Sequence, residues 1–402
     1  MRVGVGYSDN PDTAAAGRQA VLEALEQAGQ TGQCDLALLF STARHDAHIL
    51  RDAVASLVGS SVPIVGGGAV GTISNTRFGY AGDQIGLALF WLKGAQCNLV
   101  SEGDLTQGEE KTGERLGRKL AALGTTPSSQ LLLFYDSINR AKGELRLNMA
   151  THLLSGIQRG LGFLPDLFGA GLMGDHACTP TRQWAGADIV DQNALALTFS
   201  GDIRIDATVM HGCRPASGYY TVTKADKETI LEINGQPALQ FVGEVMGPSA
   251  ISPEEYGFFL AFGMNKGDKW SDFDETAYVN RLCLSVDKKR NGLIMFEPDM
   301  VEGTEFQIMY RSFDLDYMAP KMEALFAGLE GREPVFALYI VCAGRAAGYA
   351  GLDLEDAIVV QETVAGRAPL LGMYTGVEIA PVRGRPRGLD WTGVFCLFSV
   401  PK

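Results

Sequence analysis

Side chains suited to binding a small molecule gather in two short segments near the C-terminal end of the sequence. Each segment contains glycine and adjoins an apolar run with the composition of a buried strand. Glycine at a strand end lets the backbone and a ligand approach closely. Together the segments offer a thiol, a guanidinium group, two hydroxyls and a carboxylate to one cleft. The residues are Cys342, Arg345, Gly372, Tyr374, Thr375 and Glu378.

An amino-acid-like ligand would need two complementary charges. A guanidinium group matches the fork of a carboxylate, and Arg345 or Arg281 can supply one. The ammonium group needs an anion, for which Glu378 and Asp175 are candidates. The competing interpretation is that Arg345 and Glu378 pair with each other or with backbone carbonyls, because charged groups with perturbed pKa values occur in structural networks as well as in functional sites.

The glycine-rich segments allow two interpretations. Backbone amides at Gly67, Gly68 and Gly372 would form a nest that binds an anion. The run 66–71 also matches the GxGxxG pattern of dinucleotide-binding proteins. That pattern requires a following helix, whereas residues 72–82 have the composition of loop and strand. We therefore favour a small ligand over a nucleotide.

Cys342 raises the alternative of an enzyme. A thiol becomes a nucleophile when cations and backbone amides lower its pKa, and Arg345 lies three residues away. A nucleophilic thiol also needs a base, and no histidine lies near Cys342 in the sequence. A buried packing thiol is the competing interpretation. An enzyme acting on a small metabolite through Cys342 or Glu378 stays open beside ligand binding.

The histidines and the acidic residues predict no metal site. His45 and His48 lie three residues apart without a third ligand nearby. The acidic stretch 268–274 lacks the glycine and the distal glutamate of a calcium loop, which favours an exposed loop. We expect no cofactor. Haem bound through His176 or His152 is the alternative, although no CxxCH attachment sequence is present.

Composition narrows the class of protein. A chain of 402 residues is expected to form two domains. A net charge of −13 argues against a nucleic-acid partner and against an anionic membrane surface. No apolar run reaches the ~20 residues that a membrane helix needs. Seven scattered cysteines without a CxxC pair indicate a reducing compartment. We expect a cytoplasmic protein without membrane insertion.

A strand, an amphipathic helix and a glycine-containing strand recur three times in the same order. The separations from the first strand's end to the first glycine are 26, 34 and 30 residues, counted from Phe40 to Gly66, Tyr135 to Gly169 and Cys342 to Gly372. Repeated β-α-β-β units with similar spacing indicate a diverged internal repeat. We therefore predict an α/β protein in which these units form mixed sheets with flanking helices.

Short strands and turns separate the second unit from the third. Residues 230–237 predict a strand and an Asn-Gly turn, and residues 280–309 alternate between strands and turns. This pattern predicts an antiparallel sheet beside the third unit. We place one domain at residues 1–222, with two units, and a second at residues 223–402, with the third unit and the antiparallel strands.

The order and spacing of these motifs resemble the FIST family, whose members carry an N-terminal and a C-terminal FIST domain. The resemblance implies a bacterial sensory protein that binds an amino acid or related metabolite. It also implies a separate output partner, such as a histidine kinase, a cyclase or a chemotaxis component. A haem-binding nitric-oxide sensor is the alternative that the family suggests. The matching segments are 3–8, 64–71, 168–175, 234–239, 278–281, 302–303, 342–345 and 372–378.

Overall fold

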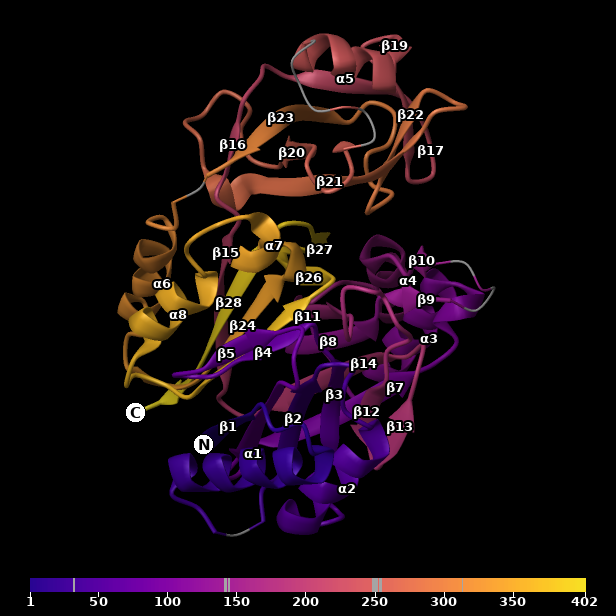
Figure 1. Ribbon diagram of the computed structural model, residues 1–402. Coiled ribbons are helices and arrows are strands. Elements are labelled where there is room, and N and C mark those ends of the chain that lie inside the picture. The colour runs from indigo at the N-terminus through magenta and orange to yellow at the C-terminus, as the bar shows by residue number, and fades with distance from the viewer. Residues whose placement is uncertain (32, 141–142, 144, 248–251, 253–254, 313) are drawn as a thin grey trace.

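One unit of four strands and two helices occurs three times in the computed structural model, which describes residues 1–31, 33–140, 143, 145–247, 252, 255–312 and 314–402 (Figure 1). In each unit the strands lie in the spatial order first, last, second, third. The second and third strands are parallel, and the last strand is antiparallel to its two neighbours. The predicted α/β class with repeated units and mixed sheets is confirmed, and each unit begins with a strand and a helix that the predicted repeat omitted.

The units follow one another along the chain. The first consists of β1 (Arg2–Ser8), α1 (Thr13–Ala28), β2 (Leu36–Ser41), α2 (Ala47–Val58), β3 (Ile64–Gly68) and β6 (Ile85–Trp91). The second consists of β7 (Gln96–Glu102), α3 (Glu109–Ala122), β8 (Gln130–Asp136), α4 (Ala150–Leu161), β11 (Asp166–Leu172) and β14 (Ala194–Ser200). The third consists of β15 (Arg204–Met210), α6 (Met318–Ala327), β24 (Arg332–Cys342), α8 (Asp356–Val364), β25 (Leu370–Thr375) and β28 (Gly393–Pro401).

A hairpin before the last strand of each unit joins the sheet of another unit. β4 (Gly71–Ile73) and β5 (Phe78–Tyr80) extend the third sheet through β25. β12 (Gln183–Gly186) and β13 (Asp188–Val190) extend the first sheet through β3. β26 (Val377–Val382) and β27 (Arg385–Leu389) extend the second sheet through β11. The exchange forms a closed cycle that ties the three units together.

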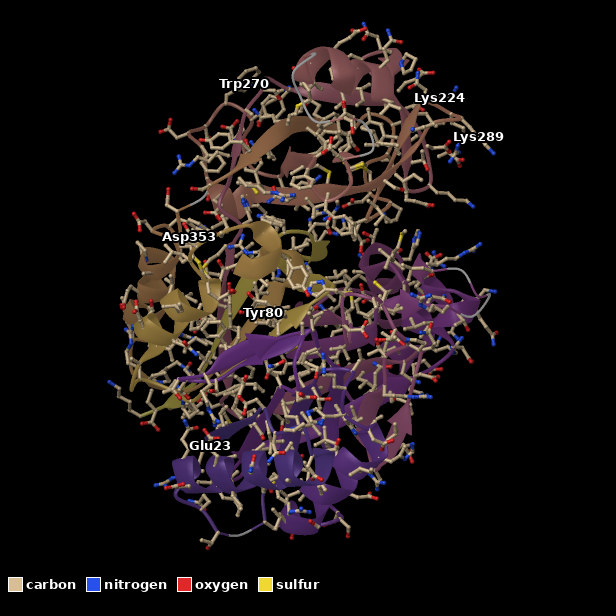
Figure 2. All side chains as sticks on the ribbon, viewed as in Figure 1. Glu23, Tyr80, Lys224, Trp270, Lys289 and Asp353 are labelled. Carbon is tan, nitrogen blue, oxygen red and sulfur yellow. The ribbon has the colours of Figure 1, made fainter. Side chains whose placement is uncertain are left out.

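Side-chain contacts reinforce this exchange. Tyr80, labelled in Figure 2, lies on the first unit's hairpin, and its ring centroid is 5.2 Å from that of Tyr374 in β25. Its hydroxyl accepts a hydrogen bond of 3.0 Å from the Gly348 amide of the third unit. The hairpin is therefore held to the third unit by backbone pairing with β25 and by the side-chain contacts of Tyr80.

The inner faces of the three sheets share one apolar core. Phe40 packs edge-on against Phe134 of the second unit, with centroids 5.3 Å apart, and Phe90 packs against Phe336 of the third unit at 5.0 Å. Helices cover the outer faces, so the central strands are buried on both sides and consist of nearly continuous apolar residues. Edge-to-face aromatic pairs add to the stabilisation that burial of these rings already provides.

Gly66, Gly169 and Gly372, the first glycines of the three predicted units, lie within strands. A Cβ atom added at Gly66 would lie 2.0 Å from the Leu39 carbonyl oxygen, and one at Gly169 would lie 1.8 Å from the Leu133 carbonyl oxygen. At Gly372 the closest approach is 3.0 Å, to the Tyr339 carbonyl oxygen among others. Glycine at these positions therefore lets the third strand of each unit approach the second.

An insertion between β15 and α6 forms a separate antiparallel sheet, drawn above the three units in Figure 1. An additional pairing of β20 with β23 closes its strands into a ring. None of the described helices is long and apolar enough to cross a membrane. The elements are β16 (Cys213–Pro215), β17 (Tyr220–Asp226), β18 (Thr229–Ile233), β19 (Gln236–Pro237), α5 (Ala238–Met246), β20 (Ala261–Asn265), β21 (Tyr278–Asp287), β22 (Gly292–Met295) and β23 (Glu305–Arg311).

Replacing Gly169 by alanine should destabilise the protein by about 1–3 kcal/mol, the range for overpacking a dense interior, because the added methyl group collides with the backbone of β8. Gly218→Ala is the control, since a Cβ atom there meets nothing within 4 Å. Urea denaturation of both variants measures the difference. Equal urea midpoints for Gly169→Ala and the wild type would contradict this prediction, because β8 and β11 would then accommodate the methyl group without loss of stability.

Candidate functional site

A cavity of about 680 Å³ lies between the inserted ring and the strand ends of the second and third units. Its volume falls within the range of small-molecule sites. The units contribute residues that end or directly follow β8, β11, β24 and β25, among them Ser137, Met173, Cys342 and Gly376. The ring contributes a mainly apolar wall that includes Phe258, Phe259, Leu284 and Phe296.

Arg311, the last residue of β23, brings a cation to this wall. Its guanidinium carbon lies 3.6 Å from the centroid of the Trp391 ring, which also lines the cavity. One Nη donates a hydrogen bond to the Phe258 carbonyl, whereas its Nε is buried and has no hydrogen-bond partner in the described part of the chain. Burial lowers the pKa of Arg311 to about 10. The group therefore remains a cation at neutral pH.

Cys342 ends β24 and contributes a nearly buried thiol to the same cavity. Burial is the main cause, and the nearby charge of Glu378 the second, of a rise in the pKa of this thiol to about 12. The Gly344 and Trp391 amides act in the opposite direction but do not overcome that effect. The thiol is consequently protonated at neutral pH, which is the form with low nucleophilicity.

Two carboxyl groups approach this region. Asp390 lines the cavity, and its Oδ2 accepts a hydrogen bond of 2.9 Å from the Leu282 amide of the ring. Burial raises the pKa of Asp390 to about 7. Glu378 is fully buried and does not line the cavity; one of its oxygens accepts a hydrogen bond from the Thr392 amide. Burial, reinforced by Asp390, raises the pKa of Glu378 well above its usual range.

The comparisons with known proteins assign the family. The FIST N domain matches residues 35–236, and the FIST C domain matches residues 238–381. The chain belongs to the FIST family. FIST domains are sensory domains of signal transduction, and here both contribute to the cavity: Ser137 and Met173 lie in the first match, Phe296 and Cys342 in the second.

The relatives among curated proteins are mycobacterial. The uncharacterized protein Mb0898c of Mycobacterium bovis is 28% identical over 54% of this FIST chain, and the match spans 56% of that relative, or about half its length. The uncharacterized protein Rv0628c of Mycobacterium tuberculosis is 25% identical over 99% of this chain and 100% of its own. Among solved structures, a cyanuric acid hydrolase from A. caulinodans shows 12% identity over 50% of this chain and 71% of its own, with a TM-score of 0.26.

Arg345, the first candidate for a carboxylate partner, forms a buried structural network in this FIST fold. Its Nη2 lies 2.7 Å from Asp356 Oδ2, and its Nε donates to the same oxygen at 2.8 Å. Its remaining donors reach the His211 carbonyl at 2.9 Å and the Tyr317 hydroxyl at 2.8 Å. Arg345 is not among the residues that line the cavity. Its donors are therefore already paired within the protein.

The other predicted polar residues divide into cavity and framework positions. Thr375 lines the cavity, and its hydroxyl donates to the Gly171 carbonyl at 2.7 Å. Tyr374 donates to Glu355 at 2.8 Å. Arg281 forms a bidentate pair with Asp299 at 2.6 and 2.7 Å. Both Tyr374 and Arg281 belong to the protein framework.

The remaining predicted positions lie away from the cavity. Gly67 and Gly68 pair with β12 and β2, and Gly372 lies within β25. Asp175 accepts hydrogen bonds from the amide and hydroxyl of Thr179 in a local turn. None of these four residues contributes to the cavity lining. The anion-binding nest predicted at Gly67, Gly68 and Gly372 therefore does not lie at this cavity.

The two histidines considered for haem have different settings. His176 lines the cavity, stacks on Tyr349 with ring centroids 3.5 Å apart, and has a buried Nε2 without a partner in the described residues. His152 is exposed on α4 and does not line the cavity. Of the two, His176 alone could present a ring nitrogen to a molecule in the cavity.

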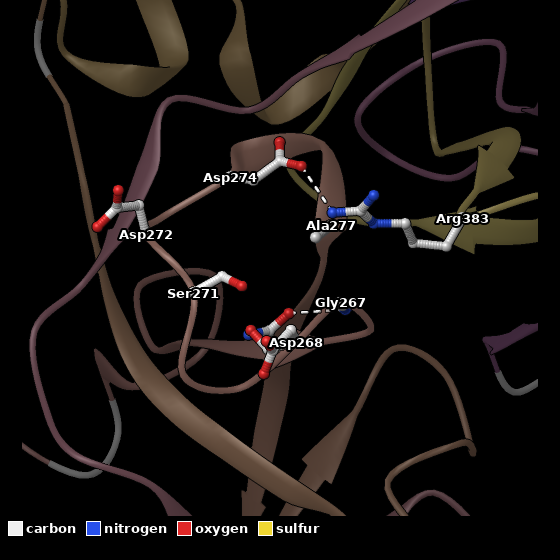
Figure 3. A pocket seen from close by; sticks show the side chains of 8 residues that line it. Gly267, Asp268, Ser271, Asp272, Asp274, Ala277 and Arg383 are labelled. Atoms are coloured by element: carbon white, nitrogen blue, oxygen red, sulfur yellow. Dashed lines mark hydrogen bonds and ion pairs between the residues drawn. The ribbon is translucent and has the colours of Figure 1, made fainter.

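The acidic stretch 268–274 borders a smaller cavity of about 290 Å³ (Figure 3). Asp274 pairs with Arg383 at 2.7 Å, and the Asn265 side chain accepts a hydrogen bond from the Gly267 amide at 2.8 Å. Among the described residues, no group of three or more His, Cys, Asp and Glu side chains is arranged to hold a metal ion. The stretch acts as a surface loop with internal hydrogen bonds.

Sequence reasoning missed Arg311 and Trp391, the stacked cation and indole ring of the cavity wall. Arg311 has only the signal of a charged residue ending the strand 305–311, and such a residue is normally solvated. Trp391 follows a hairpin whose position depends on the exchange between units. The fold brings Trp391 to Arg345, and it places Arg311 in the same cavity lining as Cys342.

Arg345→Ala should lower the free energy of unfolding by about 3–5 kcal/mol, because removing one partner leaves Asp356 as an uncompensated buried charge. Arg118→Ala is the control; it breaks an exposed helix pair with Glu114, and such pairs contribute about 0.3–0.5 kcal/mol. Urea denaturation gives both values. If the two variants unfold at the same urea concentration, the Arg345–Asp356 pair is not a structural support.

Native alkylation with iodoacetamide at pH 7 should modify Cys342 more slowly than free cysteine, because its raised pKa leaves almost no thiolate. Mass spectrometry of peptides after timed alkylation measures each cysteine. The partly exposed Cys178 is the internal control for reagent access, and unfolded protein, in which all seven cysteines react, is the control for detection. Modification of Cys342 faster than free cysteine would revive the enzyme alternative.

Proposed function

We propose that this FIST protein is a sensor that binds a small metabolite in the cavity between the inserted ring and the three-unit body. The observation that carries the proposal is the cavity itself, in which apolar walls surround one cation without an ion-pair partner among the described residues. Pockets that combine apolar surface with a few convergent polar groups are typical ligand sites. An amino acid or a related metabolite is the class that we propose.

The position of the cavity supports a signalling role. Its two walls come from separate parts of the fold, the ring and the strand ends of two units. A ligand that contacts both walls would favour the arrangement in which they are closest, and a ligand changes a conformational equilibrium by its differential affinity for the two states. We propose that a separate partner, such as a histidine kinase, a cyclase or a chemotaxis component, reads this change.

The proposed compartment is the cytoplasm. All seven cysteines are free thiols, and five of them are buried. Free buried thiols are typical of proteins in reducing compartments. This supports the same placement that the composition favoured.

His176 makes haem a second candidate for the cavity. An imidazole with a buried, unpartnered Nε2 is the chemical type of group that binds haem iron. Bound haem would supply iron for diatomic-gas binding, whereas the role of this chain would be to present His176 beside the apolar wall. The absorption spectrum of the purified protein distinguishes a haem from a colourless metabolite.

Ser285→Trp should weaken ligand binding by roughly tenfold or more, because Ser285 lies at an exposed edge of the cavity and an indole ring there would occupy ligand space. Ser200→Trp is the control, since Ser200 is exposed on β14 away from the cavity. Native mass spectrometry identifies co-purified molecules, and a thermal-shift screen of amino acids and related metabolites measures binding. Equal binding by both variants, or no binding by the wild type, would refute the proposal.

A further inference from the structure

We propose that the cavity selects a monocarboxylate with an apolar body and no second charge, with Arg311 as the residue that binds the carboxylate. This inference rests on the proposed function and narrows its ligand class, from amino acids and related metabolites to related acids that lack an ammonium group. It differs from the amino-acid arrangement predicted with Arg345 or Arg281, whose guanidinium groups are already paired with Asp356 and Asp299.

The charge of Arg311 is left uncompensated by its surroundings. No ion pair involves Arg311 in the part of the chain that the structure describes, and the one hydrogen bond that its side chain makes there goes to the neutral Phe258 carbonyl. The ionisable groups that act on it are the Cys213 and Cys342 thiols and a second cation, Arg345. A cation withdrawn from water without an anion is costly, so an anionic ligand at this point would be strongly favoured.

The donor atoms of Arg311 indicate which kind of anion would bind, because its Nε has no hydrogen-bond partner among the described residues. The Trp391 ring lies against the guanidinium group at 3.6 Å and restricts its orientation. One Nη is held by the Phe258 carbonyl, which leaves Nε as a free donor. The Nη that adjoins Nε is Nη2, the same atom that donates to Phe258, so a carboxylate would accept parallel hydrogen bonds from Nε and from the second hydrogen of Nη2. A single carboxylate is therefore the anion that best matches this group.

The rest of the cavity suits an apolar body. Phe258 and Phe259 are 56% and 65% exposed, although large aromatic side chains are normally buried. Phe258 contacts Phe296 edge-on, with ring centroids 5.3 Å apart, and Leu284 lies on the same wall. An apolar ligand body would cover this surface and gain the free energy of its removal from water.

Of the described residues that line the cavity, the two with carboxyl groups, Glu297 and Asp390, are poor partners for an ammonium group. Both carboxylate oxygens of Glu297 accept hydrogen bonds of 2.9 Å from the first amides of α4. Asp390 is partly protonated at neutral pH, since burial raises its pKa to about 7, and one of its oxygens already accepts from the Leu282 amide. A second arginine, Arg146, also lines the cavity. Unlike Arg311, its side chain is exposed and it has an interaction of its own.

The test measures binding of matched ligands by isothermal titration calorimetry. The acids are hexanoate, decanoate, 3-phenylpropionate and indole-3-acetate, each paired with its neutral amide, and L-phenylalanine is added as the zwitterion related to 3-phenylpropionate. At least one acid should bind the wild type about tenfold or more tightly than its amide, as expected for a charge-assisted hydrogen bond. L-Phenylalanine should bind more weakly than 3-phenylpropionate.

Variants of Arg311 assign the effect to one group. Arg311→Gln should remove the preference, so that each acid and its amide bind alike, whereas Arg311→Lys, which keeps the charge without the planar fork, should restore part of it. Arg214→Gln is the matched control, because Arg214 is exposed on the adjoining strand β16 and does not line the cavity. Circular dichroism verifies that each variant is folded.

The outcomes separate this inference from the proposed function. The inference is overturned if no acid binds better than its amide, if L-phenylalanine binds best, or if Arg311→Gln and Arg311→Lys both bind the acids as the wild type does. In those cases the proposed function still stands when amides or other metabolites bind the wild type and Ser285→Trp abolishes that binding. Failure of every molecule to bind the wild type overturns both.

Discussion

The carbonyl oxygen of Gly171 joins the second and third units, and the cavity depends on that junction. It accepts a hydrogen bond from the Thr375 hydroxyl at 2.7 Å and another from the Gly376 amide at 3.0 Å. The same point begins the pairing of β26 with β11. Because β25 ends here, the strand ends of two units meet at one place, and their following residues form the floor of the cavity. A comparable bond of 2.9 Å, from the Val70 amide to the Tyr374 carbonyl, joins the first unit to the third.

The junction between the second and third units differs from the other two because the inserted ring covers it. The ring is fastened over the second and third units by buried polar contacts: Glu297 caps the N-terminus of α4, Arg281 donates to the Gly388 carbonyl at 3.0 Å, and the Leu282 amide donates to Asp390. A carboxylate at a helix N-terminus also interacts favourably with the helix dipole. The ring therefore covers strand ends that would otherwise face solvent, and the cavity is enclosed between them.

Local sequence patterns predicted the strands and the repeat well, and they predicted the site incompletely. Cys342 and Thr375 could be found because residues just beyond a buried strand lie at the sheet edge, and both line the cavity. The pairing of Arg345 with Asp356 could not be predicted, since a sequence does not tell which of many carboxylates will meet a guanidinium group. Arg311 and the ring phenylalanines come from an insertion whose position over the body is determined by long-range contacts.

Burial has consistent effects on three ionisable groups of the cavity. Removal from water disfavours the charged form, so the pKa of the Cys342 thiol rises to about 12 and that of Asp390 to about 7, while that of Arg311 falls to about 10. At neutral pH the thiol is therefore neutral and Asp390 is partly so, whereas the guanidinium group keeps its charge. The same low polarity strengthens the attraction between that cation and an entering anion. The environment that suppresses a nucleophile at Cys342 is thus the one that favours tight binding of a carboxylate at Arg311.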